Sequence, residues 1–482
     1  MTKLNYNKIL LIHPLGYDIR SAKSDISRIA NIMPPLGLIS IASYLESHQI
    51  KTKVIDCFAT PFQSDALIKS YLLENRPAFI GISCTTSSFL DAVRIAAFSK
   101  SIYKNLKIII GGPHVSALKE KILINYPIID LLVIGEGEET IQNYINNHDG
   151  DLSLIKGIVY HNNDNATFTG YSNSIIELDS LPFPAYEKLD FYPAKYQLPI
   201  FDYPKYPNSS CVSSRGCPYS CSYCDRSVFR SSFRFNSANY LYEHLKYLKE
   251  RFKIKHINFY DDQFTFNRKR VVEFTELLIN NSLDISFNCA VRAEHIDDEL
   301  LKRMKQANCW MISLGIETGD EVLLSRHRKN ANLEFLSSKI YSIKKAGIRT
   351  KGLLMMGLPG ESPGSIKKSM DYVFSHPVDT FNLAKFTPFP GSPLYKNIHD
   401  LGEFNEDWEK MDCMNFLFIP KGMTKDQLEK SFIEFYKSHF KRFKVIAGYA
   451  TMLWKSPHSW MRFVKNIVHF FKFIITSKRL KT

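Results

Sequence analysis

The chain has 482 residues, of which 45% are hydrophobic and 23% are charged, proportions typical of a soluble globular protein. That length allows two or three domains with their own cores. The first residues are polar and the next apolar run is short, so no signal peptide is expected, and nine irregularly spaced cysteines indicate metal chemistry in a reducing cytoplasm and argue against a disulfide framework.

The net charge of +14 is concentrated at the C-terminal end. From Phe435 to Thr482 there are eleven Lys or Arg residues and no Asp or Glu, so the rest of the chain is nearly neutral. This asymmetry predicts an anionic surface as the partner of the tail, and it argues against a protein that coats nucleic acid.

Short apolar runs alternate with helical patterns over residues 1–150. The alternation predicts a doubly wound parallel sheet, that is, a Rossmann-like α/β domain. The expected strands are 8–14, 52–57, 78–83, 107–112 and 130–135, and the expected helices are 37–47, 64–74, 89–103 and 115–126. Ligands of such sheets bind beyond the carboxyl ends of the strands.

Three of these strand ends carry residues suited to a bulky ligand. Glycines allow close approach of the backbone, and hydroxyls supply hydrogen bonds. The candidates are Thr85, Thr86 and Ser87 after the third strand, Gly111, Gly112 and Pro113 after the fourth, and Gly135, Glu136, Gly137 and Glu138 after the fifth. Taken singly, each loop is equally well explained as an ordinary turn.

Residues 151–208 are predicted to form a connector, because they contain a short hairpin pattern near residue 157 and several prolines that favour extended chain. The alternation resumes over 209–395. Six strand-like runs, at 210–214, 256–261, 285–291, 310–316, 350–358 and 380–386, predict a partial (β/α)6 barrel. The chemistry of barrel enzymes lies at the C-terminal ends of the strands.

The first barrel strand leads into Cys217, Cys221 and Cys224, spaced Cys-x3-Cys-x2-Cys. Three thiolates on one short loop favour an iron–sulfur cluster, and a four-iron cluster held this way keeps one iron open. A zinc site completed by His244 or His256 is the alternative. Later strand ends carry further candidates, which also suit helix caps and turns: Asp261, Asp262, Arg292, Glu317, Gly357 and Gly360.

This cysteine spacing resembles the radical S-adenosylmethionine (radical SAM) superfamily. With the loops of residues 1–150 and the segment Pro34-Pro35-Leu36-Gly37, the pattern resembles the cobalamin-dependent radical SAM enzymes, which include anaerobic magnesium-protoporphyrin ester cyclase and many methyltransferases. The resemblance implies a [4Fe–4S] cluster on the three cysteines and cobalamin on residues 1–150. It also implies SAM contacts: Glu317 with the ribose, Gly357 and Gly360 near the adenine, Asp261 and Asp262 as the second-strand motif, and Arg292 as a donor.

One departure concerns the lower face of cobalamin. Domains that ligate cobalt from below carry Asp-x-His-x-x-Gly after the first strand, whereas this chain has His13-Pro14-Leu15-Gly16. We therefore expect base-off cobalamin without a protein histidine ligand, and we interpret His114 as a loop residue.

The function implied by the resemblance is C-methylation of an unactivated carbon in a small molecule, through a 5′-deoxyadenosyl radical and methylcobalamin. An electron donor such as flavodoxin or ferredoxin is implied as a partner, and no nucleic acid is expected. The alternatives are an oxidative cyclase or rearrangement enzyme with the same cofactors, a tRNA methylthiotransferase, and a non-catalytic cobalamin sensor. The methylthiotransferase class usually has three more cysteines in the first domain, where this chain has only Cys57 and Cys84.

Residues 396–482 are predicted to be helical, with Cys413 as a buried apolar residue. Between Trp460 and Ile475, apolar residues keep helical spacing opposite Arg462, Lys465, His469 and Lys472. This segment is too charged to span a membrane. It suits an interfacial helix on the cytoplasmic membrane face, with a lipophilic substrate, and it equally suits a helix packed on the barrel of its own chain.

Overall fold

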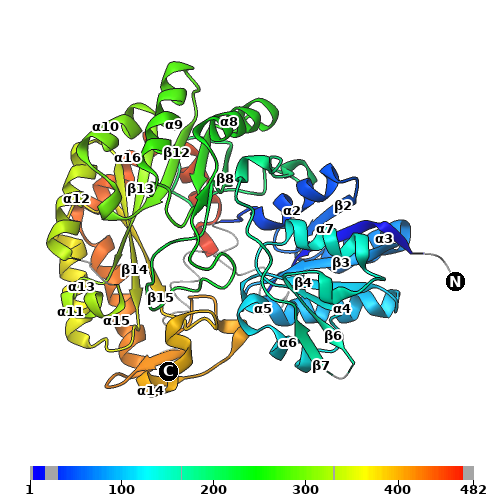
Figure 1. Ribbon diagram of the computed structural model, residues 1–482. Coiled ribbons are helices and arrows are strands. Elements are labelled where there is room, and N and C mark those ends of the chain that lie inside the picture. Colours follow the sequence, from blue (N-terminus) through cyan, green and yellow to red (C-terminus); the bar gives the residue numbers. More distant parts are fainter. Residues whose placement is uncertain (1–3, 17–30, 164, 329–331, 470–482) are drawn as a thin grey trace.

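The computed structural model describes residues 4–16, 31–163, 165–328 and 332–469. Figure 1 shows an N-terminal α/β unit, blue to cyan, beside a curled sheet covered by helices, green to yellow, with the C-terminal helices in orange and red. The expected α/β class, with a doubly wound unit followed by a partial barrel, is confirmed.

The first sheet has the strand order β2-β1-β3-β4-β5-β6-β7. The first five strands are parallel, and β6 and β7 are antiparallel additions. Because β1 lies between β2 and β3, the strand order reverses there, which is where such sheets bind ligands. The strands are β1 Asn5–His13, β2 Lys51–Asp56, β3 Pro77–Ser83, β4 Lys107–Gly111, β5 Leu131–Val133, β6 Ile158–Asn162 and β7 Asn165–Phe168.

Both faces of this sheet are buried, as expected of parallel strands that run as continuous apolar stretches. In β1, Ile9 and Leu11 belong to one core cluster, while Leu10 and Ile12 belong to another. The helices are α2 Leu36–Ser47, α3 Ser64–Asn75, α4 Phe89–Ile102, α5 Pro113–Leu118, α6 Glu120–Asn125 and α7 Glu138–Asn147. The single helix expected over 115–126 is divided, because Lys119 has a φ of 50°, which an α-helix does not accommodate.

The second sheet has the order β15-β14-β13-β12-β11-β8 and is parallel throughout. The strands are β8 Asn208–Cys211, β11 His256–Phe259, β12 Ser286–Val291, β13 Cys309–Glu317, β14 Arg349–Met356 and β15 Thr380–Lys385. The helices are α8 Ala238–Phe252, α9 Arg268–Asn280, α10 Asp298–Gln306, α11 Glu321–His327, α12 Leu333–Lys345 and α13 Pro363–Ser375. The predicted six-stranded partial barrel is therefore confirmed.

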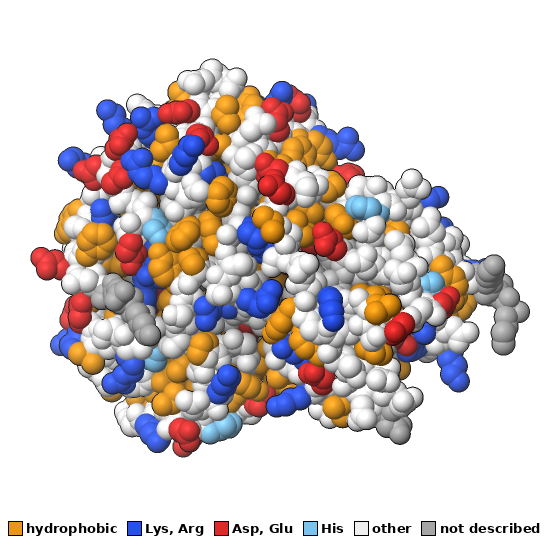
Figure 2. All heavy atoms as spheres, in the orientation of Figure 1, with side chains coloured by type: hydrophobic (Ala, Val, Ile, Leu, Met, Phe, Trp, Pro, Cys, Tyr) orange, Lys and Arg blue, Asp and Glu red, His pale blue; other side chains and the backbone are white. Residues whose placement is uncertain are grey.

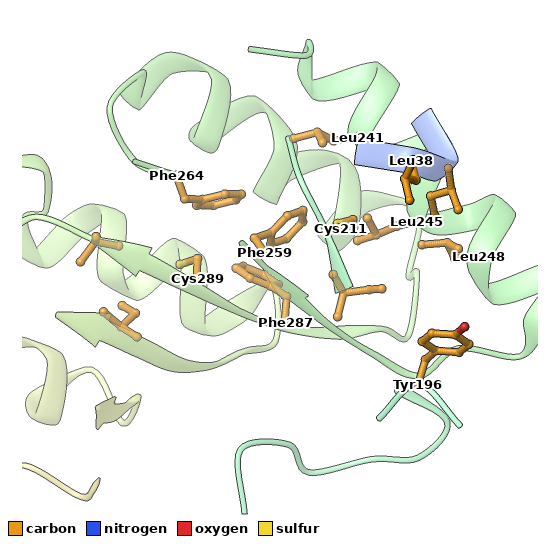
Figure 3. Close-up of a cluster of buried hydrophobic side chains, with 14 of the residues drawn as sticks. Leu38, Tyr196, Cys211, Leu241, Leu245, Leu248, Phe259, Phe264, Phe287 and Cys289 are labelled. Atoms are coloured by element: carbon orange, nitrogen blue, oxygen red, sulfur yellow. The ribbon is translucent and has the colours of Figure 1, made fainter. Parts of the chain in front are cut away.

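The connector joins the two units more closely than an extended linker would. Its hairpin, β6 and β7, completes the first sheet, so the boundary expected at residue 150 falls within the sequence that builds this sheet. Further on, Asp202 meets the N-terminal ends of the barrel strands, where it accepts a hydrogen bond from Lys351 at 2.6 Å. Figure 3 shows Leu38 of α2 beside Leu241 and Leu245 of α8, so the two units share apolar packing.

The C-terminal region is mostly helical, as expected. Its elements are α14 Ile398–Leu401, β16 Gly402–Phe404, β17 Phe418–Pro420, α15 Lys425–Phe440, α16 Phe443–Lys455 and α17 Pro457–Lys465. In α17, Trp460 and Phe463 pack on the ring of Phe201, at centroid distances of 5.4 and 5.8 Å. This part of the predicted amphipathic segment therefore contacts its own chain, whereas Phe471, Lys472, Ile474 and Ile475 lie outside the described residues. Within the described ranges, no helix has the length and apolar character needed to cross a membrane.

Candidate active site

The cysteine loop follows a short strand, β9 Ser214–Arg215, and returns through β10 Arg234–Phe235, with which β9 pairs. Cys217, Cys221 and Cys224 are half-buried free thiols on this loop. Gly216 makes the turn possible, because its φ is 85° and a Cβ there would lie 2.0 Å from the carbonyl oxygen of Ser232.

Hydrogen bonds tie the cysteine loop to the barrel. Ser222, between the second and third cysteines, shares a hydrogen bond of 2.9 Å between its hydroxyl and Nδ1 of His327. The other ring nitrogen, Nε2, lies 2.8 Å from the carbonyl oxygen of Pro359. His327 therefore links the cysteine loop to the loop that follows β14, a role that the sequence analysis missed.

The chemistry of the three thiols fits a cluster of iron ions. Burial raises the pKa of Cys217, and it raises the pKa of Cys224 to about 12. Thiols in this state become thiolates when a metal compensates the charge. Among the described residues, no group of three or more His, Cys, Asp or Glu is arranged to hold a metal ion.

Neither histidine of the zinc alternative, both of which lie in the described part of the chain, forms a metal-binding group with the cysteines. His256 begins β11, at the opposite end of the barrel strand, and its Nδ1 lies 2.8 Å from the hydroxyl of Ser286. His244 is buried in α8 and stacks on Phe183 at 4.9 Å. The alternative of a zinc knuckle completed by His244 or His256 is therefore wrong.

The two aspartates at the end of β11 have different surroundings. Asp261 is buried, and its carboxylate accepts hydrogen bonds from the amide of Ser213 at 2.6 Å and the hydroxyl of Ser214 at 2.8 Å. It therefore braces the chain that enters the cysteine loop. Asp262 instead faces the cavity described below, where loss of hydration and the neighbouring Asp261 carboxylate raise its pKa.

Arg292 follows β12 and lies against the cysteine loop. Its guanidinium stacks on Tyr219 at 3.7 Å from the ring centroid, and Nη1 is 4.0 Å from Sγ of Cys221. Glu294 accepts a hydrogen bond from Nη2 of Arg292 at 3.0 Å. A buried cation beside a thiolate stabilises negative charge, as a cluster and its ligands require.

Glu317 ends β13 at a bulge, with a φ of 65°. A Cβ on Gly315 would lie 2.7 Å from the Glu317 carboxylate, so glycine is needed beside it. Burial raises the pKa of Glu317, although the Arg328 guanidinium and a hydrogen bond from Tyr223 partly lower it. Because Tyr223 belongs to the cysteine motif, this carboxylate lies next to the cysteine loop.

The loop after β14 has two glycines in the left-handed region, Gly357 with a φ of 94° and Gly360 with a φ of 87°. A Cβ on Gly360 would lie 1.9 Å from Nη1 of Arg326. The carboxyl group of Glu361 is buried and accepts a hydrogen bond from the amide of Gly357. Burial raises the pKa of Glu361 to about 8. Glu361 thus holds the loop from inside, and the two glycines carry no side chains, whereas Leu358 and Pro359 stand between them.

A cavity of about 370 Å³ lies between the strand ends of the first sheet and the mouth of the barrel. The predicted residues that line it are Gly111, Gly112, Pro113, Gly135, Glu136, Gly137, Glu138 and Asp262. Gly112 has a φ of 115°, and a Cβ there would lie 2.2 Å from the carbonyl oxygen of Cys84. A glycine-rich wall that opens toward the cysteine loop allows close approach of a bulky cofactor such as cobalamin.

Two of the lining residues also hold the domains together. Arg215 donates from Nη1 to Glu136 at 2.7 Å and from Nη2 to Glu138 at 2.6 Å. Arg234, the strand partner of Arg215, also donates to Glu136 at 2.8 Å. The carboxylates of Glu136 and Glu138 are thus engaged by arginines of the barrel domain. The sequence analysis missed both arginines, although Arg215 stands only two residues before the first cysteine.

The remaining predicted residues lie away from the cavity wall. Thr85 and Ser87 form a turn with Ser88, and Thr86 contacts Nδ1 of His114 at 3.3 Å. His114 is buried between Phe89 and Trp408 and does not line the cavity. Arg292, Glu317, Gly357 and Gly360 surround the cysteine loop on the barrel side.

The first domain has no cysteine set for a second cluster, which the methylthiotransferase alternative calls for. Cys57 and Cys84 are buried, and burial raises the pKa of both thiols. Figure 2 shows Lys and Arg side chains interspersed with Asp and Glu over the face that it draws. That face has no extended basic patch of the kind that binds nucleic acid.

Family models match both units of the chain. Residues 211–373 match the Radical SAM superfamily, and residues 23–145 match the B12 binding domain. A relative from Pyrococcus horikoshii, named uncharacterized methyltransferase PH0819, is 28% identical and is covered over 91% of this chain and 94% of its own. An anaerobic magnesium-protoporphyrin IX monomethyl ester cyclase of Rubrivivax gelatinosus is 24% identical, over 90% of this chain and 77% of its own.

Solved structures share the fold. The radical SAM methyltransferase TsrM of Kitasatospora setae, solved with cobalamin and a [4Fe–4S] cluster, has a TM-score of 0.65 and 15% identity, over 82% of this chain and 75% of its own. The cobalamin-dependent enzyme OxsB has a TM-score of 0.71 and 18% identity, over 96% of this chain and 72% of its own. The expected cofactors, a [4Fe–4S] cluster, SAM and cobalamin, are confirmed at the level of the family. The chain belongs to the radical SAM superfamily and is an enzyme of the kind that carries a B12-binding domain.

Proposed function

We propose that the enzyme methylates an unactivated carbon of a small molecule, and that Cys217, Cys221 and Cys224 hold its cluster. The observation that carries this proposal is the cavity, which is lined both by the glycine-rich strand ends of the B12-binding domain and by Ser214, Arg215 and Asp262 of the barrel mouth. The cluster with SAM supplies a hydrogen-abstracting radical, and cobalamin supplies a transferable methyl group.

The residues of the chain would bind and orient these partners. Glu317 would accept hydrogen bonds from the ribose hydroxyls of SAM. Arg292 would donate a hydrogen bond to the SAM carboxylate and place its positive charge beside the cluster ligand Cys221. Gly357 and Gly360 give the loop after β14 the left-handed backbone that brings it toward the adenine. Asp262 faces the cavity, whereas Asp261, whose carboxylate is engaged by Ser213 and Ser214, positions the cysteine loop and does not contact SAM.

Cobalamin would bind base-off without a protein histidine. His13, the last residue of β1, has its Nδ1 2.8 Å from the Asp56 carboxylate, which supports a structural role. In the cob(II)alamin form, paramagnetic resonance should therefore show no nitrogen coupling that disappears on changing His13 or His114.

The test of function uses protein reconstituted anaerobically with iron, sulfide and cobalamin, a flavodoxin or ferredoxin as reductant, and SAM with a deuterated methyl group. We expect 5′-deoxyadenosine and a product from a bacterial lysate that carries the labelled methyl group. Replacing Cys217, Cys221 and Cys224 together by Ala should abolish both, while Cys413→Ala, the matched control, should retain them.

Cyclisation with the same cofactors is the second candidate, because a relative named as an ester cyclase matches 90% of the chain. A product that has lost hydrogen and gained no label would favour it. Label without 5′-deoxyadenosine would contradict the radical route, and a triple cysteine variant that still cleaves SAM would contradict the cluster assignment.

A further inference from the structure

The helix α16 exposes large apolar side chains on the side opposite to its packing. Val445 and Met452 are buried against the rest of the chain, whereas Phe443 and Trp454 are 82% and 80% exposed. Helical spacing puts the exposed residues on one side of the helix. The α16 face consists of Phe443, Ile446, Leu453 and Trp454.

Further exposed apolar side chains follow in and just beyond the next helix. Met461 and Val464 of α17, and Val468 three residues past its end, are 46%, 58% and 58% exposed. Because α16 is apolar on both its inner and its outer side, it lacks the polar outer face of an ordinary surface helix. Exposed apolar surface gathered in this way marks an interaction site.

The charges around the α16 face are of one sign. Lys441, Lys444, Lys455 and Lys465 are exposed beside it, and the chain has no Asp or Glu after Glu434. Nearby acidic groups at this end of the barrel are already engaged, since Asp284 pairs with Lys205 and Asp379 pairs with Lys344.

We propose that the α16 face docks on an anionic lipid surface. Apolar side chains that include a tryptophan, flanked by lysines, are what an interfacial helix presents to anionic lipid headgroups and the acyl chains beneath them. A second copy of the chain is a poorer occupant, because a two-fold contact through this face would bring two basic regions together.

Docking here would leave the mouth of the barrel accessible. The hydroxyl of Tyr449 in α16 lies 3.5 Å from Oγ1 of Thr380, the first residue of β15. The face therefore lies at the N-terminal ends of the barrel strands, while the cysteine loop lies toward their C-terminal ends. A soluble electron donor would reach the cysteine loop of the lipid-bound protein.

The test is co-sedimentation of the full chain with vesicles of equal parts phosphatidylcholine and phosphatidylglycerol, at low and high salt. We expect salt-sensitive binding that is at least about tenfold weaker for Phe443→Ser with Trp454→Ser. The matched control is Ile124→Ser with Val322→Ser, which changes side chains that are 63% and 66% exposed elsewhere and should bind like the wild type. All of these positions are exposed, so circular dichroism should stay unchanged.

Three results would overturn the proposal. One is absence of binding to the anionic vesicles at low salt, or equal binding to pure phosphatidylcholine. Another is loss of binding with Phe471→Ser and Ile474→Ser but not with Phe443→Ser and Trp454→Ser, which would assign lipid binding to the end of the chain. The third is a dimer in light scattering that the α16 substitutions convert to monomer, which would make a second copy the occupant.

Discussion

Replacing Arg215 by Leu should lower the free energy of unfolding by about 3–5 kcal/mol, because it removes one partner of a buried ion pair. The Arg215 side chain is 13% exposed, and those of Glu136 and Glu138 are 8% and 4% exposed. Arg234 would still neutralise Glu136. Glu138 would keep the hydroxyl of Ser40, 2.7 Å away, and a backbone hydrogen bond as partners for a carboxylate that is only 4% exposed.

The loss should depend on pH in a way that identifies Glu138. Burial alone would raise the pKa of this carboxyl, but the Arg215 guanidinium and its hydrogen bonds hold the pKa below its usual value. In the wild type the ionised Glu138 therefore stabilises the fold at pH values above the ordinary carboxyl pKa, and this stabilisation is lost as the pH falls below that value. In Arg215→Leu, burial is no longer compensated, so the cost is present at neutral pH and is relieved on acidification. The difference between the two proteins should therefore begin to narrow as the pH falls from neutral toward about 4.5, where the variant loses its cost, and narrow further below that pH, where the wild type loses its stabilisation.

The assay is urea unfolding of wild type, Arg215→Leu, Glu138→Leu and the double variant, combined as a double-mutant cycle. The matched control is Arg303→Leu, which removes exposed pairs with Glu276 and Glu299 and should cost at most about 1 kcal/mol. A coupling energy between Arg215 and Glu138 below about 0.5 kcal/mol, or a pH-independent loss, would refute the reasoning.

Two further predictions concern the barrel loops. Burial raises the pKa of Glu361 to about 8. Ionised Glu361 therefore destabilises the fold, and this cost is fully present above that pH and absent below about pH 4. Glu361→Gln should raise the melting temperature of the apo chain at pH 8.5 and change it little at pH 5, and a gain confined to low pH would contradict this. His327→Phe removes hydrogen bonds to Ser222 and Pro359, worth about 1 kcal/mol each. The reconstituted variant should therefore lose iron faster during desalting than the wild type or the control His376→Phe. Equal retention of iron would show that His327 does not hold the cysteine loop.

The elements that depend on local patterns were predictable from the sequence. Five parallel strands of the first sheet and six of the barrel follow from short apolar runs that alternate with helical periodicity. The grouping of the three cysteines could be predicted from their spacing, because all three lie on one loop and need no distant partner. The division of α5 and α6 at Lys119 was not visible, because nothing in its residue type announces a φ of 50°.

The residues that the sequence left ambiguous are those whose role is decided by a distant partner. Glu136 and Glu138 at the start of α7 suit a ligand contact or a helix cap equally well, and only the fold brings Arg215 onto them. Asp261 has the same difficulty, since its partners Ser213 and Ser214 belong to another strand end. The exposed apolar face of α16 could not be predicted from the sequence, because its residues are of the same types as those of the core.

The cysteine loop sets the geometry on both sides of the cavity. From its two ends, Arg215 and Arg234 hold the acidic residues of the B12-binding domain. Between them, the hydroxyl of Ser227 donates to the carbonyl of Pro113 at 3.1 Å, in one of the glycine-rich loops that line the cavity. On the barrel side, Ser222 is held by His327 and Tyr223 reaches Glu317. One loop therefore contacts the cavity wall of one domain and the strand ends of the other. A shift of this loop would move the cysteines relative to both, so we expect its contacts to help set the distance between the cysteines and the cavity.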